Sequence, residues 1–147
     1  MNVYLRDVTI EDVEIIFEWR NDLTARCNSF SNSIIDIESH IEWFNRKLAE
    51  PDCYMYILMD GEECVGQIRV DKVGDVGEIS YIIAPDKRKM GYGKKILKLI
   101  EESADENIKV LTGFVKIDNQ PSRRCFTYNN YSEFIAIDNI VCYIKAL

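Results

Sequence analysis

The residues with the clearest chemical potential lie in a short glycine-containing loop between a predicted strand and a predicted helix. The loop holds Gly91 and Gly93, and residues 86–98 contain a single acid, Asp86, among six bases, namely Lys87, Arg88, Lys89, Lys94, Lys95 and Lys98. Such a loop exposes backbone N–H groups at the start of a helix, where an anion can bind. The whole chain has a net charge of −7, so these bases are concentrated locally. The pattern predicts a binding site for a phosphorylated cofactor.

The spacing of the loop residues distinguishes between phosphate-binding motifs. A nucleoside-triphosphate P-loop is excluded because Arg88 replaces its first glycine and Lys95 replaces its Ser or Thr. A dinucleotide fingerprint is excluded because Ile96 replaces its last glycine. The segment Arg88-Lys89-Met90-Gly91-Tyr92-Gly93 instead resembles the [QR]-x-x-G-x-[GA] signature of the GNAT N-acetyltransferases. The alternative is an ordinary strand-to-helix crossover with a solvated basic loop.

The resemblance implies a cofactor and a set of contacts. In this family the loop amides hold the pyrophosphate of acetyl-CoA, which assigns cofactor binding here to Arg88, Lys89, Met90, Gly91, Tyr92, Gly93 and Lys94. The family's central strand also separates from the strand after it, and the pantetheine arm pairs with the exposed backbone. Here that implies backbone contacts at Ile82, Ile83 and Ala84.

A second segment resembles the family's N-x-x-[AS]-x-x-x-[YF]-x-x-x-G-F pattern, whose helix contacts the pantetheine. Its residues here are Asn119, Ser122 and Phe126. Asn119 can also be a helix N-cap, and the two roles can use different atoms. Asn130 replaces the glycine of the pattern, and asparagine tolerates the left-handed conformation. Phe126 stands where many relatives have the tyrosine that protonates the leaving thiolate, so we expect solvent water or direct thiolate release to replace it.

Glu78 is the candidate general base, because it lies on the central strand where GNAT enzymes with a glutamate base carry it. An alkylammonium is mostly protonated at neutral pH, so a carboxylate that removes its proton assists attack on a thioester. The alternative is a salt bridge to a basic residue on a neighbouring strand. An acetyl-cysteine intermediate at Cys125 is discounted because no histidine stands near it in the sequence. We therefore expect direct transfer within one ternary complex.

Four residues are candidates for acceptor binding, namely Arg20, Asn21, His40 and Trp43. Their segments, Trp19-Arg20-Asn21 and His40-x-x-Trp43-Phe44, resemble those lining the acceptor pocket in one GNAT branch. That branch includes amino-sugar nucleotide N-acetyltransferases and acetylases of ribosomal-protein N-termini. Arg20 would suit an acceptor phosphate, and Trp43 could stack on a base or sugar ring. The alternatives are a salt bridge for Arg20, a surface position for His40 and core packing for the tryptophans.

Periodicity predicts the elements that must position these residues. The alternation of Ile79, Tyr81 and Ile83 predicts a strand ended by Pro85, and the spacing of Ile96, Leu97, Ile100 and Ala104 predicts an amphipathic helix. The complete series is a strand at 2–7, a helix from Thr9 to about 21, a loop at 21–35, a helix at 36–49, strands at 53–60, 64–71 and 77–84, a helix reaching 104, a strand at 109–117, a helix at 119–129 and a strand at 133–144.

This order, β-α-α-β-β-β-α-β-α-β, is that of the GNAT fold. It implies one α/β (α+β) domain over residues 1–147, with a mixed, mostly antiparallel sheet of about six strands flanked by four helices. The length and the 47% hydrophobic and 29% charged content suit one soluble globular domain.

Composition also limits location and partners. No apolar run could span a membrane and no signal peptide opens the chain, which predicts a cytoplasmic protein without a membrane partner. Five scattered cysteines without a C-x-x-C motif predict reduced core thiols and no metal site. The net charge of −7 disfavours nucleic acid as a partner and mildly favours a cationic amine.

The function predicted from these features is acetyl transfer from acetyl-CoA to a primary amine, with an amino group of a nucleotide-linked sugar as the favoured acceptor. The alternative acceptor is the N-terminus of a peptide or ribosomal protein. An alternative of another class is a CoA-binding sensor without turnover, and a third is an α/β interaction domain whose basic loop binds an acidic partner. Family members can self-associate through the last strand, so a homodimer is an open expectation.

Overall fold

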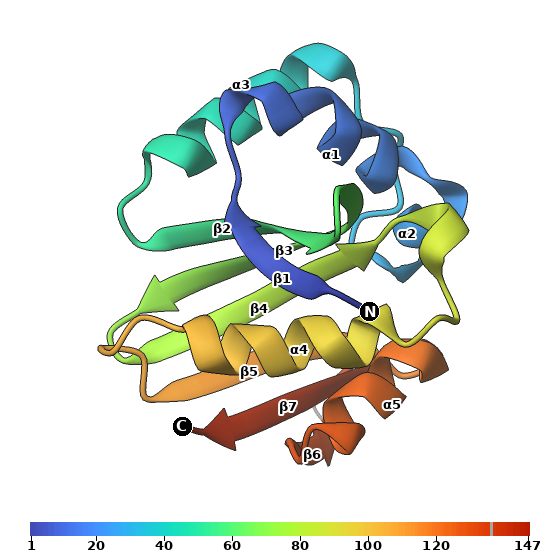
Figure 1. The fold of residues 1–147 in the computed structure, drawn as a ribbon. Helices are drawn as coiled ribbons and strands as arrows, with labels where there is room; N and C mark the ends of the chain where they lie inside the picture. Colours follow the sequence, from blue (N-terminus) through green and yellow to red (C-terminus); the bar gives the residue numbers. More distant parts are fainter. Residues whose placement is uncertain (136) are drawn as a thin grey trace.

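The computed structural model describes residues 1–135 and 137–147, and its seven strands form one sheet with helices packed on both faces (Figure 1). The strands are β1 (Val3–Asp7), β2 (Cys53–Asp60), β3 (Glu63–Val73), β4 (Val76–Ile83), β5 (Val110–Lys116), β6 (Ser132–Ile135) and β7 (Ile140–Ala146). Their spatial order is β1-β2-β3-β4-β5-β7-β6. Every neighbouring pair is antiparallel except β4 and β5, which run parallel and are joined by a helical crossover.

The described helices are α1 (Val13–Asn21), α2 (Leu23–Asn28), α3 (Ile37–Ala49), α4 (Tyr92–Ser103) and α5 (Gln120–Tyr128), with short 3-10 turns at Ile10–Asp12 and Pro85–Lys87. The polar residues that begin them act as caps. The Asp36 carboxylate accepts the N–H of Ser39 at 2.9 Å, and the Asp12 carboxylate accepts the N–H of Thr9 at 2.8 Å. Thr9 and Asp12 therefore form a capping box at the first of these turns.

Two apolar clusters, one on each face of the sheet, hold the layers together. Ile96, Leu97 and Ile100 of α4 pack with the strand residues that point to their side, and none of them is more than 1% exposed. On the opposite face, Ile16 of α1 and Phe44 of α3 are fully buried against β2. The alternation predicted for β4 is confirmed, because its odd-numbered side chains join the first cluster and Ile82 joins the second.

The structure differs from the expected elements in two places. The predicted loop at 21–35 contains the short helix α2, which begins because the Asp22 carboxylate caps the N–H of Ala25 at 3.1 Å. The predicted single strand at 133–144 is two strands, β6 and β7, and the turn between them includes positive-φ residues Asp138 and Asn139. Residue 136, inside that predicted strand, lies outside the described residues. The described sheet therefore has seven strands rather than about six, and the described α-helices number five rather than four.

Two expectations based on composition can also be compared with the structure. No helix among the described residues is both long enough and apolar enough to cross a bilayer. All five cysteines are free thiols, as expected. Cys27 is exposed rather than in the core, and the other four are partly buried, of which Cys53, Cys64 and Cys125 pack against the apolar clusters.

Candidate active site

The sheet opens into a fork between its two parallel strands. β4 and β5 pair over only four residues each, from Val76 opposite Val110 to Ile79 opposite Gly113. Beyond Gly113, β5 continues to Lys116 paired with β7 alone, and β4 continues to Ile83 paired with β3 alone. One side of each strand is therefore unpaired within the fork, and an extended molecule could hydrogen-bond there.

The pairing of β4 with β3 determines which backbone groups face the fork. The Ala84 N–H donates to the Val65 carbonyl at 2.9 Å. Backbone groups point to alternate sides of a strand, so Ile82 and Ala84 direct theirs toward β3. Tyr81 and Ile83 direct theirs into the fork. Of the three residues predicted to pair with pantetheine, Ile83 is thus the one whose backbone is oriented for it.

The loop after β4 presents unpaired donors at the start of α4. Gly91 caps the helix in the left-handed conformation with φ of 87°, and a Cβ placed on it would meet no atom within 4 Å. Its carbonyl accepts the Lys95 N–H at 3.3 Å. Within the described part of the chain, the N–H groups of residues 91–94 have no hydrogen-bond acceptor. Open space beside several free N–H donors suits a phosphate oxygen.

Neighbouring elements anchor the side chains of this loop. Tyr92 is buried and donates from its hydroxyl to Asp60 at 2.6 Å, so it can offer a ligand only its backbone N–H. Arg88 pairs with Asp22, the cap of α2, at 2.8 Å. Lys89, with φ of 64°, and Met90 are exposed. The predicted loop residues are therefore brought together around the start of α4.

Gly93 is required for packing rather than for a special backbone angle. A Cβ at this position would lie 2.7 Å from the sulfur of Cys125 on α5 and 3.7 Å from the Tyr81 hydroxyl. The second glycine of the motif therefore lets α4, α5 and β4 approach closely. Lys94 also contacts α5, because its ammonium lies 4.4 Å from the centre of the Tyr128 ring.

Helix α5 supplies the next group of predicted residues. Asn119 caps the helix by accepting the Ser122 N–H at 3.4 Å, as expected of an N-cap. The Ser122 hydroxyl hydrogen-bonds to the Tyr81 hydroxyl at 2.9 Å, which links α5 to the fork side of β4. Asn130 adopts φ of 66°, the left-handed conformation that replacing a glycine required.

Phe126 lies in the core at the base of the fork. It is 2% exposed, stacks on Tyr143 with ring centres 4.8 Å apart, and contacts Tyr81 and Tyr131 edge-on. Its Cζ would lie 2.5 Å from a Cβ on Gly113, so the absence of a side chain on Gly113 makes room for the ring. Tyr128, the nearby tyrosine, is 65% exposed and does not reach this position.

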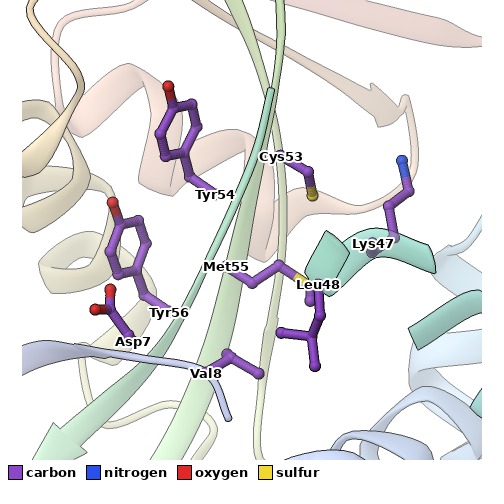
Figure 2. Close-up of a pocket in the computed structure, with 8 residues that line it drawn as sticks. All are labelled: Asp7, Val8, Lys47, Leu48, Cys53, Tyr54, Met55 and Tyr56. Atoms are coloured by element: carbon purple, nitrogen blue, oxygen red, sulfur yellow. The ribbon is translucent and has the colours of Figure 1, made fainter. Parts of the chain in front are cut away.

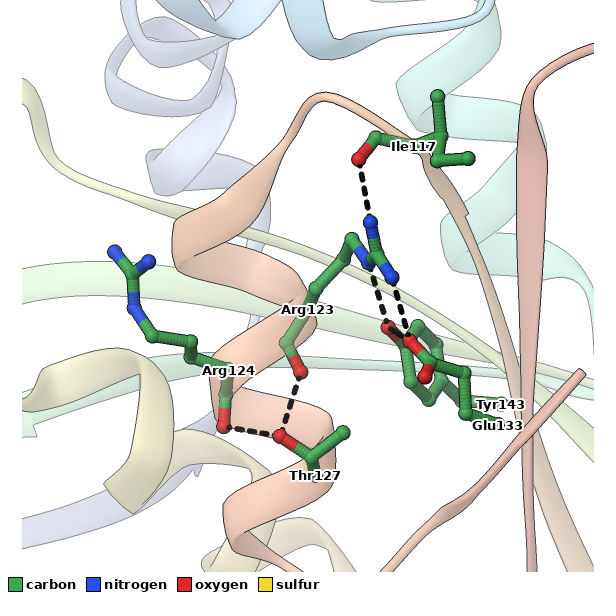
Figure 3. Close-up of polar contacts among 6 residues, drawn as sticks. All are labelled: Ile117, Arg123, Arg124, Thr127, Glu133 and Tyr143. Atoms are coloured by element: carbon green, nitrogen blue, oxygen red, sulfur yellow. Dashed lines mark hydrogen bonds and ion pairs between the residues drawn. The ribbon is translucent and has the colours of Figure 1, made fainter. Parts of the chain in front are cut away.

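A polar network at the other end of α5 fixes that helix against the C-terminal strands (Figure 3). Arg123 donates to the Ile117 carbonyl at 2.8 Å, to Glu133 at 3.0 Å and to the Tyr143 hydroxyl at 3.3 Å. Tyr143 in turn donates to Glu133 at 2.6 Å. Hydrogen bonds from Tyr143 and Arg123 hold the pKa of Glu133 below its usual value.

Glu78 lies on the opposite face of the sheet from α4 and is exposed. Its neighbour across β3 is Asp71, which is itself paired with Arg69 at 2.8 Å and with Lys47 at 3.0 Å. Its neighbour across β5 is Thr112. Among the described residues Glu78 has no ion-pair partner, so the salt-bridge alternative has no support there. Its carboxylate remains available to a substrate amine.

Arg20 and His40 form a connected pair beside Trp43. Arg20 donates to His40 Nδ1 at 2.9 Å, and because a guanidinium only donates, the ring proton resides on Nε2. Nε2 donates to the Val13 carbonyl at 2.8 Å. His40 is fully buried, and burial lowers its pKa. His40 is therefore a neutral core residue, not a surface one, and it holds the Arg20 guanidinium in position.

The remaining acceptor candidates have different roles. Trp43 is partly exposed, and the Arg20 guanidinium stacks on it with its carbon 3.9 Å from the ring centre. Asn21 donates to and accepts from the backbone of Ile35 at 2.7 and 2.8 Å, which closes the loop before α3. Trp19 is 6% exposed, as core packing predicts.

Two surface hollows lie near these elements. One, of about 290 Å³, lies beside β2 between β1 and the end of α3, and none of the predicted site residues lines it (Figure 2). The other, of about 410 Å³, lies at the separated end of β5 between Lys116 and Phe30. None of the predicted site residues lines the second hollow either.

Comparison with known proteins identifies the family. A sequence profile described as the acetyltransferase (GNAT) domain matches residues 2–130. The chain belongs to this GNAT family. GNAT acetyltransferases use acetyl-CoA as the acetyl donor, and acetyl-CoA is therefore the cofactor of this acetyltransferase. No curated protein matches the sequence itself.

Solved structures share the fold. A spermidine N-acetyltransferase from Vibrio cholerae, in complex with CoA and spermine, superposes with a TM-score of 0.86 at 14% identity, over 99% of this chain and 95% of that one. The aminoglycoside acetyltransferase AAC(6')-Ib with coenzyme A gives 0.81 at 16% identity, over 98% and 94%. A domain from Methanocaldococcus jannaschii gives 0.81 at 18% identity, over 99% and 98%. These superpositions show that the chain has the GNAT fold, and at such low sequence identity they do not identify the acceptor.

Three residues of the site were missed in the sequence, namely Asp22, Arg69 and Tyr81. The only signal for Arg69 was its position two residues before Asp71, which places both side chains on the same face of β3, opposite Ser80 and Glu78 of β4. Asp22 and Tyr81 gave no such signal, because their partners are distant along the chain.

Proposed function

We propose that this GNAT acetyltransferase moves the acetyl group directly to a primary amine, with donor and acceptor meeting at the fork and Glu78 acting as base. The observation that carries the proposal is the fork itself, flanked by free N–H donors on one face of the sheet and by an unpaired carboxylate on the other. The fork lies between the N–H donors and the carboxylate.

The loop and α4 hold the donor. The N–H groups of residues 91–94 bind the diphosphate, assisted by Arg88, while the Ile83 backbone pairs with the pantetheine arm. Asn119 and Ser122 flank that arm from α5. When bound, acetyl-CoA supplies an activated thioester. Because Arg88 already pairs with Asp22, diphosphate competes with Asp22 for the guanidinium.

Glu78 prepares the acceptor. With an alkylamine pKa near 10.4, only roughly one molecule in 10³ is neutral at pH 7. The carboxylate takes the ammonium proton as nitrogen attacks the thioester carbon, the carbon–sulfur bond breaks, and the thiolate leaves. General-base help of this kind contributes roughly 10²–10⁴ in rate.

The thiolate is protonated by solvent in this proposal. Phe126 cannot donate a proton. Tyr81 on β4 carries a hydroxyl near the fork, but burial raises its pKa and the hydroxyl is already hydrogen-bonded to Ser122. Release of a thiol with an ordinary pKa needs no stronger acid.

The favoured acceptor is the amino group of a nucleotide-linked sugar, and the runner-up is a peptide or ribosomal-protein N-terminus. Arg20, stacked on Trp43 and without a carboxylate partner among the described residues, supports an acceptor with a phosphate. The spermine and aminoglycosides bound by the structural neighbours are polycations, which this arginine would repel. A cytoplasmic location and a homodimer through the C-terminal strands remain parts of the proposal.

The test is release of free CoA thiol from acetyl-CoA with a panel of amines. We expect turnover with at least one amine, and a Glu78→Gln variant that binds CoA normally but turns over roughly 10²-fold or more slowly, most of all at low pH. Tight CoA binding without thiol release for any amine would favour the sensor alternative. An unaltered pH profile in the variant would assign the base to another residue.

A further inference from the structure

Two guanidinium groups lie against the same indole on the acceptor face of the sheet. The guanidinium carbon of Arg20 lies 3.9 Å from the centre of the Trp43 ring, and that of Arg69 lies 5.2 Å from it. Since both distances share one ring centre, the two carbons lie within about 9 Å of each other. Like charges placed this close repel unless an anion lies between or beside them.

Of the two arginines, Arg69 has a carboxylate partner among the described residues and Arg20 has none. Arg69 donates to Asp71 at 2.8 Å, and Lys47 pairs both with Asp71 at 3.0 Å and with Glu50 at 3.4 Å. Arg20 uses one nitrogen on the neutral ring of His40, and within the described residues no carboxylate lies at ion-pair distance from it. Burial and, after it, the charge of Arg69 lower the pKa of Arg20 to about 10, so it stays charged at neutral pH at a cost in free energy.

Hydrogen bonds hold both guanidinium groups in place and leave other N–H groups free to bind. Arg20 is held by the neutral ring of His40, and Arg69 is held by the Asp71 carboxylate and the Ser80 hydroxyl. His40 fixes the Nη1 end of Arg20 and is itself fixed by the Val13 carbonyl. The Ser80 hydroxyl accepts from Arg69 Nη2 at 3.3 Å. Rigid, partly desolvated guanidinium groups bind phosphate or carboxylate oxygens well, because little side-chain entropy is lost on binding.

The pair lies close to the proposed base. Ser80, the partner of Arg69, and Glu78 are two residues apart on β4 and point to the same face, so their Cα atoms are separated by roughly 7 Å. An acceptor that reaches from Glu78 to Arg69 and Arg20 therefore needs an amine and an anionic group that are separated by at least a few bonds.

We propose that Arg20 and Arg69, held against Trp43, form an anion-binding subsite that selects amine acceptors carrying a phosphate. The inference rests on the proposed function for the direction of transfer, but the subsite itself can be tested by binding. Arg69 becomes a specificity-determining residue, and His40 becomes a positioning residue for Arg20. Polyamines, which lack an anionic group, are excluded as preferred acceptors.

The first experiment measures anion binding without turnover. The enzyme is saturated with CoA to fill the diphosphate loop, and inorganic pyrophosphate is titrated while tryptophan fluorescence is followed. Trp43 is one of only two tryptophans and the other, Trp19, is buried in the core, so we expect a signal that disappears in Trp43→Phe. Arg20→Gln and Arg69→Gln should each weaken binding roughly tenfold or more.

Matched controls separate charge from folding. Arg46→Gln removes an exposed arginine from the same helix as Trp43 and should leave pyrophosphate affinity unchanged. Arg20→Lys and Arg69→Lys keep the charge but lose the planar fork, so they should fold and bind with intermediate affinity. Equal affinity in the wild type, Arg20→Gln and Arg69→Gln, or no signal in the CoA-bound wild type, would overturn the proposal.

The second experiment compares acceptors that differ by one group. O-phosphoethanolamine should give a higher kcat/KM than ethanolamine with the wild type, and Arg20→Gln should remove most of that preference by raising KM rather than lowering kcat. Equal kcat/KM for the two amines would count against the subsite while leaving the acetyltransferase proposal intact. If no amine is acetylated, the function proposal fails and the pyrophosphate titration still decides the subsite.

Discussion

A paired glycine substitution gives the sharpest test of the diphosphate loop. Gly91 and Gly74 both have positive φ, 87° and 62°, and a Cβ on either would meet nothing within 4 Å. Gly91 begins α4 beside free N–H donors, whereas Gly74 lies in the turn between β3 and β4. Gly91→Val and Gly74→Val thus carry comparable backbone strain, and only Gly91 lies where we propose that a phosphate approaches.

The expected loss of stability is similar in the two variants. Strain at a positive φ costs about 2 kcal/mol for a side chain with a branched β-carbon. For a chain of this length that lowers Tm by about 4–8 °C in each variant. A Cβ at either position meets no atom within 4 Å, so we expect both variants to fold.

Cofactor affinity should separate them. An added side chain at Gly91 occupies the space proposed for a phosphate oxygen, so CoA affinity measured by calorimetry should fall at least tenfold, a free-energy loss of about 1.4 kcal/mol or more. Gly74→Val should bind CoA as the wild type does. Equal CoA affinity in the two variants, at equal Tm, would refute the assignment of the loop.

Three further outcomes are expected. Gly113→Ala places a Cβ 2.5 Å from the Phe126 ring and should lower the free energy of unfolding by about 1–3 kcal/mol in urea denaturation, whereas an unchanged value would mean that the ring moves freely. Hydrogen bonds from the Arg6 guanidinium hold the pKa of Asp12 below its usual value. The ionised Asp12 therefore stabilises the fold above its unfolded pKa near 3.9, and this stabilisation is lost as pH falls through the folded pKa. Asp12→Asn should therefore destabilise the protein at pH 7 and much less at pH 2, and a constant difference in urea titrations would contradict this. Asp22→Asn releases Arg88 and should raise CoA affinity a few-fold by calorimetry, and unchanged affinity would show that the ion pair does not compete with the diphosphate.

The sequence predicted the elements whose side chains repeat regularly and the loop whose motif is local. Strand β4 and helix α4 follow from apolar spacing, because their burial is set by the sheet face they cover. The cap at Asn119 follows from residue type and position alone. Short-range patterns of this kind are sufficient wherever the deciding partner lies within a few residues.

The parts that the sequence did not predict depend on distant partners. α2 is only six residues long and has no buried residue, so its helical period is too short to detect. His40 was assigned to the surface or the pocket, yet contacts with Val13 and Arg20, more than one helix away, place it in the core. The split of the last strand depends on a turn whose positive-φ residues are not glycine. The opposition of Arg69 to Ser80 required the β3–β4 register.

The incomplete seam between β4 and β5 has a consequence for motion. Among the described residues, four β4–β5 pairs join the β1–β4 half of the sheet to the β5–β7–β6 half. We therefore expect local separation of the two halves to begin at this junction. A pantetheine arm in the fork would hydrogen-bond as an additional strand would and connect the two halves of the sheet. Amide hydrogens at Tyr81 and Ile83 should then exchange far more slowly with CoA bound, and the coenzyme becomes a structural member of the sheet as well as a reactant.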